Sequence, residues 1–238
     1  MPAKAKQRPR AATRNAPRPA RAARRDTSVA DIFEKLRGRI AQQEIPPGAK
    51  LREADLAREF RVARTRIRDA LAALEQRGLV ERIPNRGAVV MRLDLSQAFH
   101  IYDLREVLEG LAARLATQNV PAQHWQAELA RFSGPMEKLV AHGELDEYIG
   151  HYERLRIAII EAAANPVLAG MLDIIFEKIQ VLIRRIIILP GRAEQGRRQH
   201  VAMLEAMARG DAAEAERLRR EGLHSARIAL EKYQRYIL

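Results

Sequence analysis

Apolar residues recur at helical spacing in three segments of the first third of the chain. Residues 29–40 carry large apolar side chains three or four positions apart, and Ser28 and Asp31 before them have the spacing of a capping box. A shorter segment follows at about residues 53–60. After a three-residue turn, a third segment ends at Gly78, and its inward stripe consists of Ile67, Ala70, Leu71 and Leu74. The pattern predicts three helices, the second and third joined by a tight turn.

Two short β-rich segments follow the third predicted helix. They span residues 79–83 and 88–91, and Pro84-Asn85-Arg86-Gly87 joins them, which predicts a β-hairpin. Three helices and a hairpin, with a short turn between the second and third helices, describe a winged helix-turn-helix. We place this domain at residues 26–94.

From residue 95 to residue 238 the pattern is helical almost throughout. Pro, Gly and Asn divide this part into six or seven helices, with breaks near residues 119–121, 133–135, 141–143, 165–166, 190–191 and 209–211. Roughly 140 residues are enough for a helical bundle of its own. The predicted fold class is therefore mainly α, with an N-terminal winged helix-turn-helix followed by an all-α bundle.

Composition and motifs narrow the function classes. None of the 238 residues is cysteine, which excludes disulfides, iron–sulfur clusters and thiolate zinc sites. The most apolar segment, residues 186–189, is far shorter than the roughly 20 residues of a membrane span. We expect a cytoplasmic, nucleoid-associated protein that does not contact a membrane. The sequence contains no P-loop, G-x-S-x-G or H-E-x-x-H motif, so we do not expect an enzyme.

The positive charge is concentrated near the N-terminus. The formal net charge is +12, and residues 1–25 hold nine Lys and Arg and no acidic residue. Residues 26–92 hold fourteen basic and ten acidic residues, and the remainder is close to neutral. Because residues 1–25 combine Pro with Arg and Ala and carry almost no large apolar side chain, we expect a disordered basic tail. The tail is either a solubilising leader or an arm that adds phosphate contacts.

Basic residues gather on the outward side of the third predicted helix and at the hairpin tip. With the apolar stripe turned inward, Arg64 and Arg68 lie one turn apart on the outer face, where guanidinium groups match the O6 and N7 acceptors of guanine. Arg86 has the reach for the adjacent minor groove, and Gly87 lets the backbone approach a phosphate. The predicted contacts to double-stranded DNA are Arg64, Thr65, Arg66, Arg68, Arg86 and Gly87.

The segment LREADLAREFRVARTRIRDALAALEQRGLVERIPNRGAVV, residues 51–90, resembles the GntR family of bacterial transcription regulators. The match includes the L-x-E-x-x-L-A opening, the R-T and R-x-A-L stretches of the recognition helix, and the N-R-G wing. Two positions depart from the usual pattern: Ala63 replaces a capping Ser, and Arg66 replaces a Pro.

This resemblance implies how the domain uses DNA. Arg64 and Arg68 would read bases, Thr65 would hold a phosphate, and the tip at Arg86 and Gly87 would enter the minor groove. Members of the family act as homodimers on palindromic operators, usually as repressors. The alternative function is a non-specific architectural DNA-binding protein, which the basic tail favours and the nearly neutral C-terminal part does not.

Residues 95–238 resemble the FCD effector domain of the FadR-like GntR subgroup. The segment IYDLREVLEGLAARLA has Arg105 and Glu109 in an R-x-x-x-E frame, IIEAAANPVL carries the A-x-x-N landmark at Asn165, and HVAMLEAMARGDAAEAERLRREGLH is similar to the closing segment. The resemblance implies an effector-binding and dimerisation domain.

Many FCD domains bind a divalent metal ion through one Asp and three His. Counting back from Asn165 puts the Asp and the first His positions at Tyr152 and Arg156, which cannot replace those ligands, and only His200 and His224 are retained. We therefore expect no metal cofactor. The predicted alternative is a cavity for a small carboxylate or phosphate metabolite, formed by Arg105, Tyr152, Arg156, His200 and His224.

Two other interpretations of Arg156 stay open from the sequence. A guanidinium inside a helical bundle is costly unless it is paired, so Arg156 could form an internal ion pair with Glu109. It could also lie on the surface if the helix is phased differently.

Overall fold

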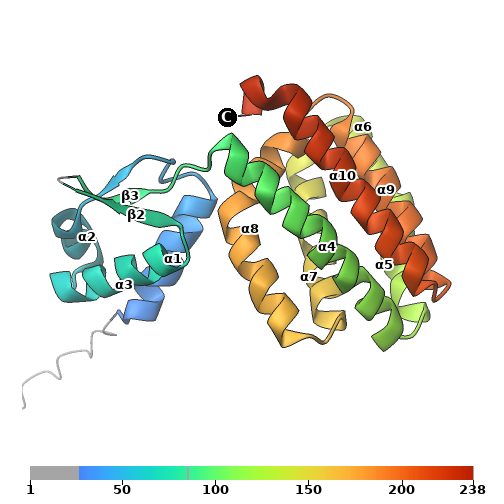
Figure 1. Ribbon diagram of the computed structural model, residues 1–238, viewed down its shortest axis with the longest axis horizontal. Helices are drawn as coiled ribbons and strands as arrows, with labels where there is room; N and C mark the ends of the chain where they lie inside the picture. Colours follow the sequence, from blue (N-terminus) through green and yellow to red (C-terminus); the bar gives the residue numbers. More distant parts are fainter. Residues whose placement is uncertain (1–26, 85, 238) are drawn as a thin grey trace, which may run out of the picture.

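The computed structural model describes residues 27–84 and 86–237, in which helices and one small sheet form two adjoining units (Figure 1). The basic tail predicted at residues 1–25 and Asn85 of the predicted wing lie outside the described residues. The predicted fold class is confirmed, because the described chain is mainly helical and its sheet is confined to the first unit. None of the described helices is both long and apolar enough to cross a membrane.

The first unit is a winged helix-turn-helix. Its strands form an antiparallel sheet in the order β1-β3-β2, in which Val80 faces Val90 and Leu51 faces Ala88. The predicted hairpin is β2-β3, whereas β1 was not predicted because two residues are too few to show an alternating pattern. The elements are α1 (Val29–Ala41), β1 (Lys50–Leu51), α2 (Glu53–Phe60), α3 (Arg64–Gln76), β2 (Val80–Ile83) and β3 (Gly87–Val90).

The core of this unit forms between α1 and α3. Both helices bury the stripes that the sequence predicts, and the least exposed side chains are Ile32, Leu36, Ile67 and Leu74. α1 begins at the predicted capping box, where Ser28 Oγ accepts a hydrogen bond from the Asp31 backbone N–H at 3.1 Å. Just beyond α3, Gly78 adopts φ +68°, a conformation that disfavours residues with a Cβ atom.

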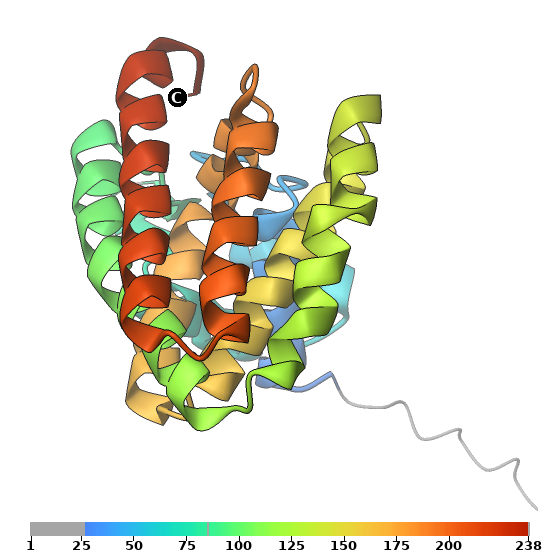
Figure 2. The same cartoon turned by 90° about the vertical axis from the view of Figure 1, so that its right-hand side faces the viewer.

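The second unit is an all-α bundle. α10 packs along α4, α9 packs along α10, and α5 packs along α9 (Figure 2). Its core is separate from that of the first unit and includes Trp125, Phe132, Leu172 and Leu204. The helices are α4 (Leu95–Asn119), α5 (Gln123–Ser133), α6 (Pro135–His142), α7 (Leu145–Ala162), α8 (Pro166–Ile187), α9 (Arg192–Ala208) and α10 (Ala212–Ile237).

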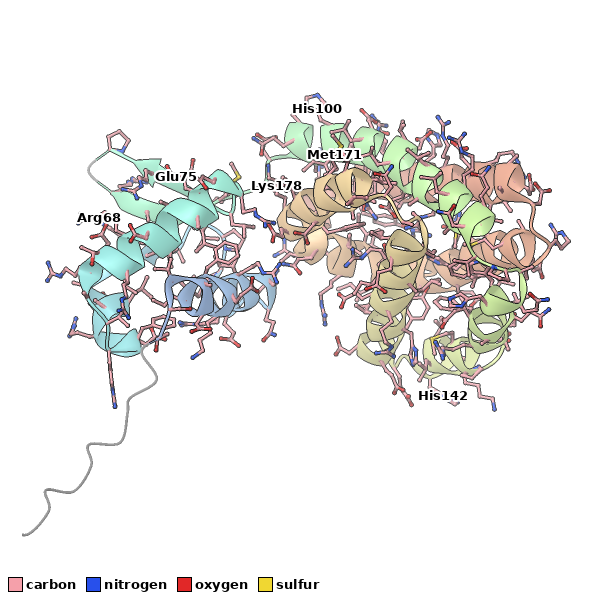
Figure 3. All side chains as sticks on the ribbon, turned by 90° about the horizontal axis from the view of Figure 1, so that it is seen from below. Arg68, Glu75, His100, His142, Met171 and Lys178 are labelled. Carbon is pink, nitrogen blue, oxygen red and sulfur yellow. The ribbon has the colours of Figure 1, made fainter. Side chains whose placement is uncertain are left out.

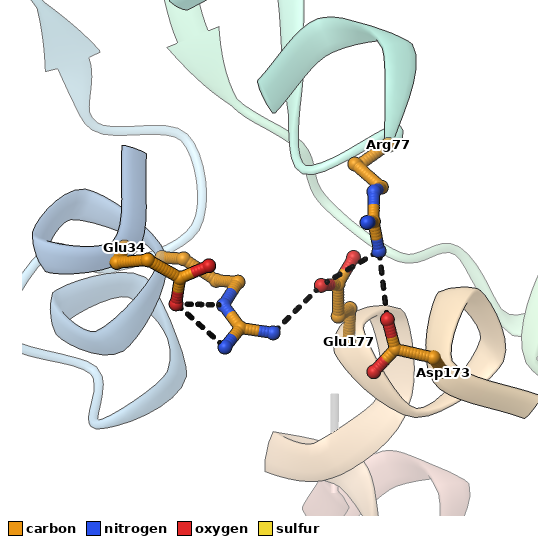
Figure 4. A network of polar contacts seen from close by, with 5 residues as sticks. Glu34, Arg77, Asp173 and Glu177 are labelled. Atoms are coloured by element: carbon orange, nitrogen blue, oxygen red, sulfur yellow. Dashed lines mark hydrogen bonds and ion pairs between the residues drawn. The ribbon is translucent and has the colours of Figure 1, made fainter. Parts of the chain in front are cut away.

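The two units meet where α8 faces α1 and the end of α3. Glu177 of α8 is buried, and its Oε1 accepts hydrogen bonds from Arg37 at 2.9 Å and from Arg77 at 3.1 Å (Figure 4). Arg77 also donates to Asp173 at 2.8 Å. One α8 carboxylate thus binds Arg37 of α1 and Arg77, the residue that follows α3, and so links the two units.

Candidate functional site

The first candidate site is the outer face of α3. Arg64, Thr65 and Arg68 are all exposed, as the sequence predicts for a helix that enters a groove. Arg68 lies on a part of α3 remote from the helical bundle (Figure 3). It forms a two-pronged pair with Glu53 of α2, with Nε to Oε1 at 3.2 Å and Nη2 to Oε2 at 3.1 Å. This pair lowers the pKa of Glu53 and keeps the Arg68 guanidinium at the protein surface.

The Arg66 side chain does not lie on the exposed face that Arg64 and Arg68 share. Its Nη1 donates to the backbone carbonyl of Thr27 at 3.1 Å, and its side chain is half-buried. Two residues along a helix turn the side chain by about 200°, so Arg66 lies away from the face that Arg64 and Arg68 share. This hydrogen bond links the segment just before α1 to α3.

The wing supplies a second basic surface. Arg86 and Gly87 are exposed at the hairpin tip, and Gly87 has φ +78° with open space where a Cβ atom would lie. A recess beside them is also lined by Lys50, Arg52 and Arg82. The sequence analysis missed Lys50 and Arg52 because it did not predict β1, which brings the segment before α2 next to β3, and it did not single out Arg82 of the predicted hairpin. The recess therefore gathers cations of the kind that contact a phosphate backbone.

The second candidate site is a cavity of about 50 Å³ inside the helical bundle. Helices α4, α7, α8, α9 and α10 all contribute to its wall. The polar side chains in that wall belong to Tyr102, Arg105, Tyr148, Tyr152, Arg192, Gln199, His200 and Arg219, and apolar contacts come from α8 through Ile183, Ile186 and Ile187.

A buried carboxylate organises one side of the cavity. Glu109 Oε1 accepts a hydrogen bond from Arg105 Nε at 2.6 Å, and Glu109 Oε2 accepts one from Arg219. Arg105 also donates to the Tyr152 hydroxyl at 3.3 Å. Burial alone would raise the pKa of Glu109, but the two guanidinium groups hold it at about 2, so the carboxylate stays ionised.

His200 belongs to the same network as a neutral ring. Its Nδ1 is hydrogen-bonded to the Gly196 carbonyl at 2.6 Å, and its Nε2 accepts from Arg219 at 3.0 Å. Burial, and then the charge of Arg219, lower the pKa of His200 to about 3. At neutral pH the imidazole is therefore uncharged, and both ring nitrogens are engaged.

Arg192 differs from the other two cavity arginines because no carboxylate within the described chain pairs with it. Its Nη1 donates to Gln199 at 3.2 Å and its Nη2 to the Gly222 carbonyl at 3.4 Å. Its Nε is buried without a hydrogen-bond partner among the described residues. Burial lowers the pKa of Arg192, whereas the charge of Glu109 contributes to the raised pKa of Arg105.

Of the five predicted effector residues, the structure brings together Arg105, Tyr152 and His200. Arg156 is not in the cavity: its guanidinium stacks on Phe176 at 3.8 Å and lines a recess that faces α1. It makes no ion pair with Glu109, because Arg105 and Arg219 occupy both oxygens of that carboxylate.

His224 also lies outside the cavity. Its side chain is 60% exposed, with Nδ1 3.7 Å from Glu106. It follows Arg219 by five residues, which turns it by about 140° on α10, away from the cavity. The sequence analysis missed the other polar residues of the wall, which are Tyr102, Tyr148, Arg192, Gln199 and Arg219. The spacing of Tyr148, one turn before Tyr152, was the only pattern that could have indicated one of them.

The residues of the cavity do not fit the metal ion that many FCD domains bind. Within residues 27–84 and 86–237, no group of three or more His, Asp or Glu is arranged to hold a metal. The lone pair of His200 Nε2 is used by Arg219, whose charge would also repel a cation. The cavity suits a group of negative charge instead.

Comparison with known proteins assigns the chain to a family. The family described as "Bacterial regulatory proteins, gntR family" matches residues 29–90, and the FCD domain matches residues 100–225. The chain is a GntR-family regulator with an FCD domain. Proteins of this family are DNA-binding transcription regulators, not enzymes, and their FCD domains bind small-molecule effectors.

Individual relatives agree with this assignment. An HTH-type transcriptional regulator in the TAR-I ttuE-ttuC' intergenic region of Agrobacterium vitis is 28% identical over 58% of this chain and 81% of its own length. A Paenarthrobacter nicotinovorans protein named "Probable D-xylose utilization operon transcriptional repressor" is 33% identical over 50% of this chain and 51% of its own. The solved structure of E. coli McbR/YncC has the same fold, with a TM-score of 0.69 at 21% identity over 86% of this chain and 98% of that one.

Proposed function

We propose that this GntR-family regulator represses transcription as a homodimer on a palindromic operator, and that a small anionic metabolite in the helical cavity controls its affinity for DNA. The observation that carries the proposal is the excess of guanidinium groups around one cavity, where the buried Arg105 and Arg219 share the carboxylate of Glu109 and the half-buried Arg192 pairs with no carboxylate of the described chain. Uncompensated buried charge is costly, so an anion that enters is strongly favoured.

The outward arginines support the DNA-binding part of the proposal. Arg64 and Arg68 share one exposed face of α3, and Arg86 extends the cationic surface to the wing. Repression is supported by the name of the Paenarthrobacter relative, a probable transcriptional repressor. A winged unit this small holds few base pairs alone, so two copies related by a two-fold axis would read the two halves of a palindrome.

Helix α8 provides the route from the cavity to the DNA-binding unit. Ile183 and Ile186 of α8 line the cavity, and Glu177 of the same helix binds Arg37 and Arg77 of the winged unit. A ligand that repositions α8 therefore changes the support under α1 and α3. This arrangement couples two sites through one rigid element.

An exposed apolar stripe supports the dimer. Val167, Met171 and Ile174 lie one turn apart on α8, and Leu104 and Val107 are exposed on α4, which is in contact with α8. Met171 lies on the outer surface of the bundle (Figure 3). Exposed large apolar side chains of this kind are typical of a protein interface, and a second copy of the chain covers them in our proposal.

DNA binding is tested with duplexes taken from upstream of the protein's own gene and from random sequence, at one salt concentration. The proposal predicts a preference for the upstream site of at least roughly 1,000-fold. Equal affinity for both duplexes would instead support the architectural protein. Mass spectrometry of small molecules released from the purified protein should find an anion, and adding that released fraction back should change operator affinity.

The dimer is tested by light scattering during size-exclusion chromatography. The wild type should have a mass near twice 26.9 kDa, and Met171→Asp should reduce it to that of one chain. Ile228→Asp is the matched control, because Ile228 is also about half exposed but lies on α10. A wild type that is monomeric with and without DNA would refute the dimer.

A further inference from the structure

At neutral pH the ionisable side chains around the cavity carry an excess of positive charge. His200 is neutral because burial and Arg219 hold its pKa at about 3, and burial raises the pKa of Tyr102 and of Tyr148. The charged groups of the network are then three guanidinium groups and the carboxylate of Glu109. The network therefore carries two more positive than negative charges at neutral pH.

One of the two excess positive charges belongs to Arg192, and the other to the cluster of Arg105, Arg219 and Glu109. Arg105 and Arg219 share Glu109, whereas Arg192 has only two long hydrogen bonds to neutral oxygens, at 3.2 and 3.4 Å. Its Nε lies buried with no partner in the described structure. A guanidinium group binds a carboxylate or phosphate through two parallel N–H groups, so Arg192 has donors to spare for a ligand.

The size of the cavity limits the ligand to a few heavy atoms. Its volume is about 50 Å³, whereas a single water needs about 10–15 Å³ and a cavity that holds benzene has about 150 Å³. This space suits an ion of the size of phosphate or oxalate, whereas a sugar or a nucleotide would have to extend out of it.

Resting on the proposed function, we infer that the cavity binds a small dianion directly through its arginines, with Arg192 as the principal contact and without a metal ion. The two negative charges match the two excess positive charges of the network. Glu109 stays in place and keeps Arg105 and Arg219 oriented toward the ligand. The arginines thus supply the positive charge that a metal ion supplies in other FCD domains.

Calorimetric titration in EDTA tests the charge of the ligand with oxalate, oxamate and phosphate. Oxalate and oxamate have the same shape and number of heavy atoms, but oxamate carries one negative charge. We expect oxalate or phosphate to bind at least roughly tenfold more tightly than oxamate, because only a dianion neutralises the network. Which of the two dianions binds more tightly distinguishes a carboxylate ligand from a phosphate ligand.

Arg192→Gln tests the contact residue, and Arg198→Gln is its control. Arg198 lies on the same helix, but its side chain is 70% exposed. We expect Arg192→Gln to weaken binding of the preferred dianion by roughly 10- to 100-fold, and Arg198→Gln to leave it unchanged. Circular dichroism melting should show that Arg192→Gln is folded and no less stable than the wild type, because the change removes a half-buried charge that no carboxylate of the described chain compensates.

Three results would overturn the inference. The first is equal affinity for oxalate and oxamate, and the second is anion binding that requires an added divalent metal. The third is no binding of oxalate or phosphate up to about 10 mM, which corresponds to a binding free energy too small for an effector. Operator binding is measured on the same preparations, so a protein that prefers its operator but binds no dianion refutes this inference and leaves the proposed DNA-binding function standing.

Discussion

The molecule uses arginine in two opposite settings. On α3, Arg64 and Arg68 are exposed, and the only carboxylate that Arg68 pairs with in the described chain is Glu53, at the surface of α2. In the bundle, Arg105 and Arg219 are buried against Glu109. In water an ion pair contributes little and exchanges readily for a phosphate, whereas inside a protein each charge depends on its partner.

Because of this difference, DNA affinity and folding stability should respond to different substitutions. Changes to the exposed arginines should alter DNA affinity and leave folding unaffected. Changes to the buried network should alter stability and ligand binding, and should affect DNA only through α8. Each prediction below tests one side of this separation.

The largest expected effect is on the stability of the bundle. Glu109→Gln leaves Arg105 and Arg219 without their buried counter-charge, which should lower the free energy of unfolding by about 3–5 kcal/mol. Urea denaturation measures it. Glu106→Gln is the control, because that carboxylate is partly exposed and 3.7 Å from its partners, so it should cost less than about 1 kcal/mol. Equal losses would mean that burial does not distinguish the two carboxylates.

The next effect is on DNA. Arg64→Ala or Arg68→Ala should each weaken operator binding by roughly 5- to 150-fold and reduce the preference over random DNA. Fluorescence anisotropy with both duplexes measures this, and melting temperatures should stay at the wild-type value. Arg58→Ala is the control, because the Arg58 side chain is 80% exposed on α2 and pairs only with a neighbouring turn. Equal losses on both duplexes would reduce Arg64 and Arg68 to phosphate contacts.

The two sites also differ in how far the sequence predicts them. The recognition helix is a local feature: the inward stripe of α3 fixes its outer face, so Arg64 and Arg68 could be placed from spacing alone. The orientation of Arg66 could not be predicted in this way, because it depends on a hydrogen bond to Thr27, far away in sequence, and its DNA contact stays a prediction. Helix boundaries in the bundle were likewise predictable, because Pro, Gly and Asn mark them.

The cavity depends on contacts that no local pattern shows. It forms where five helices meet, and the side that each helix turns inward depends on its phase against the others. His224 was therefore expected in the cavity, although the α10 residues that line it are Leu218, Arg219, Gly222, Leu223 and Ala226. Arg192 follows directly after a loop, where periodicity carries no information about direction.

Acidification should weaken the bundle through His200. In the folded protein, burial and the charges of Arg219 and Arg192 hold the pKa of His200 at about 3, against the opposing charge of Glu109. The unfolded chain binds a proton below about pH 6.5 and the folded chain does not, so stability is lost as the pH falls from about 6.5 toward 3. The loss from this residue should be about 2 kcal/mol between pH 6.5 and 5.

Urea denaturation at pH 7, 6 and 5 checks this effect. His200→Gln should show a shallower fall in stability than the wild type, and His142→Gln, an exposed control, should match the wild type. Glu109 contributes mainly below its ordinary pKa of 4.5, because its folded pKa is about 2. Burial also lowers the pKa of His151, but His151 is present in both proteins, so the difference between the wild type and His200→Gln isolates the His200 imidazole. Parallel slopes for the wild type and His200→Gln would show that His200 is charged in the folded protein.

The smallest expected effect concerns the start of the recognition helix, which folds without a side-chain cap. Ala63 occupies the N-cap of α3 and makes no side-chain hydrogen bond, whereas Ser28 caps α1 through the Asp31 N–H at 3.1 Å. Ala63→Ser should therefore raise the free energy of unfolding by about 1 kcal/mol, and Ser28→Ala should lower it by a similar amount. Urea denaturation of the two variants measures both changes. The new hydroxyl satisfies a backbone N–H without moving Arg64 or Arg68, so operator affinity should stay within about twofold of the wild type. A gain in stability accompanied by a large loss of operator affinity would mean that these N–H groups hold a DNA phosphate, and the exposed face of α3 would then act through its backbone as well as its arginines.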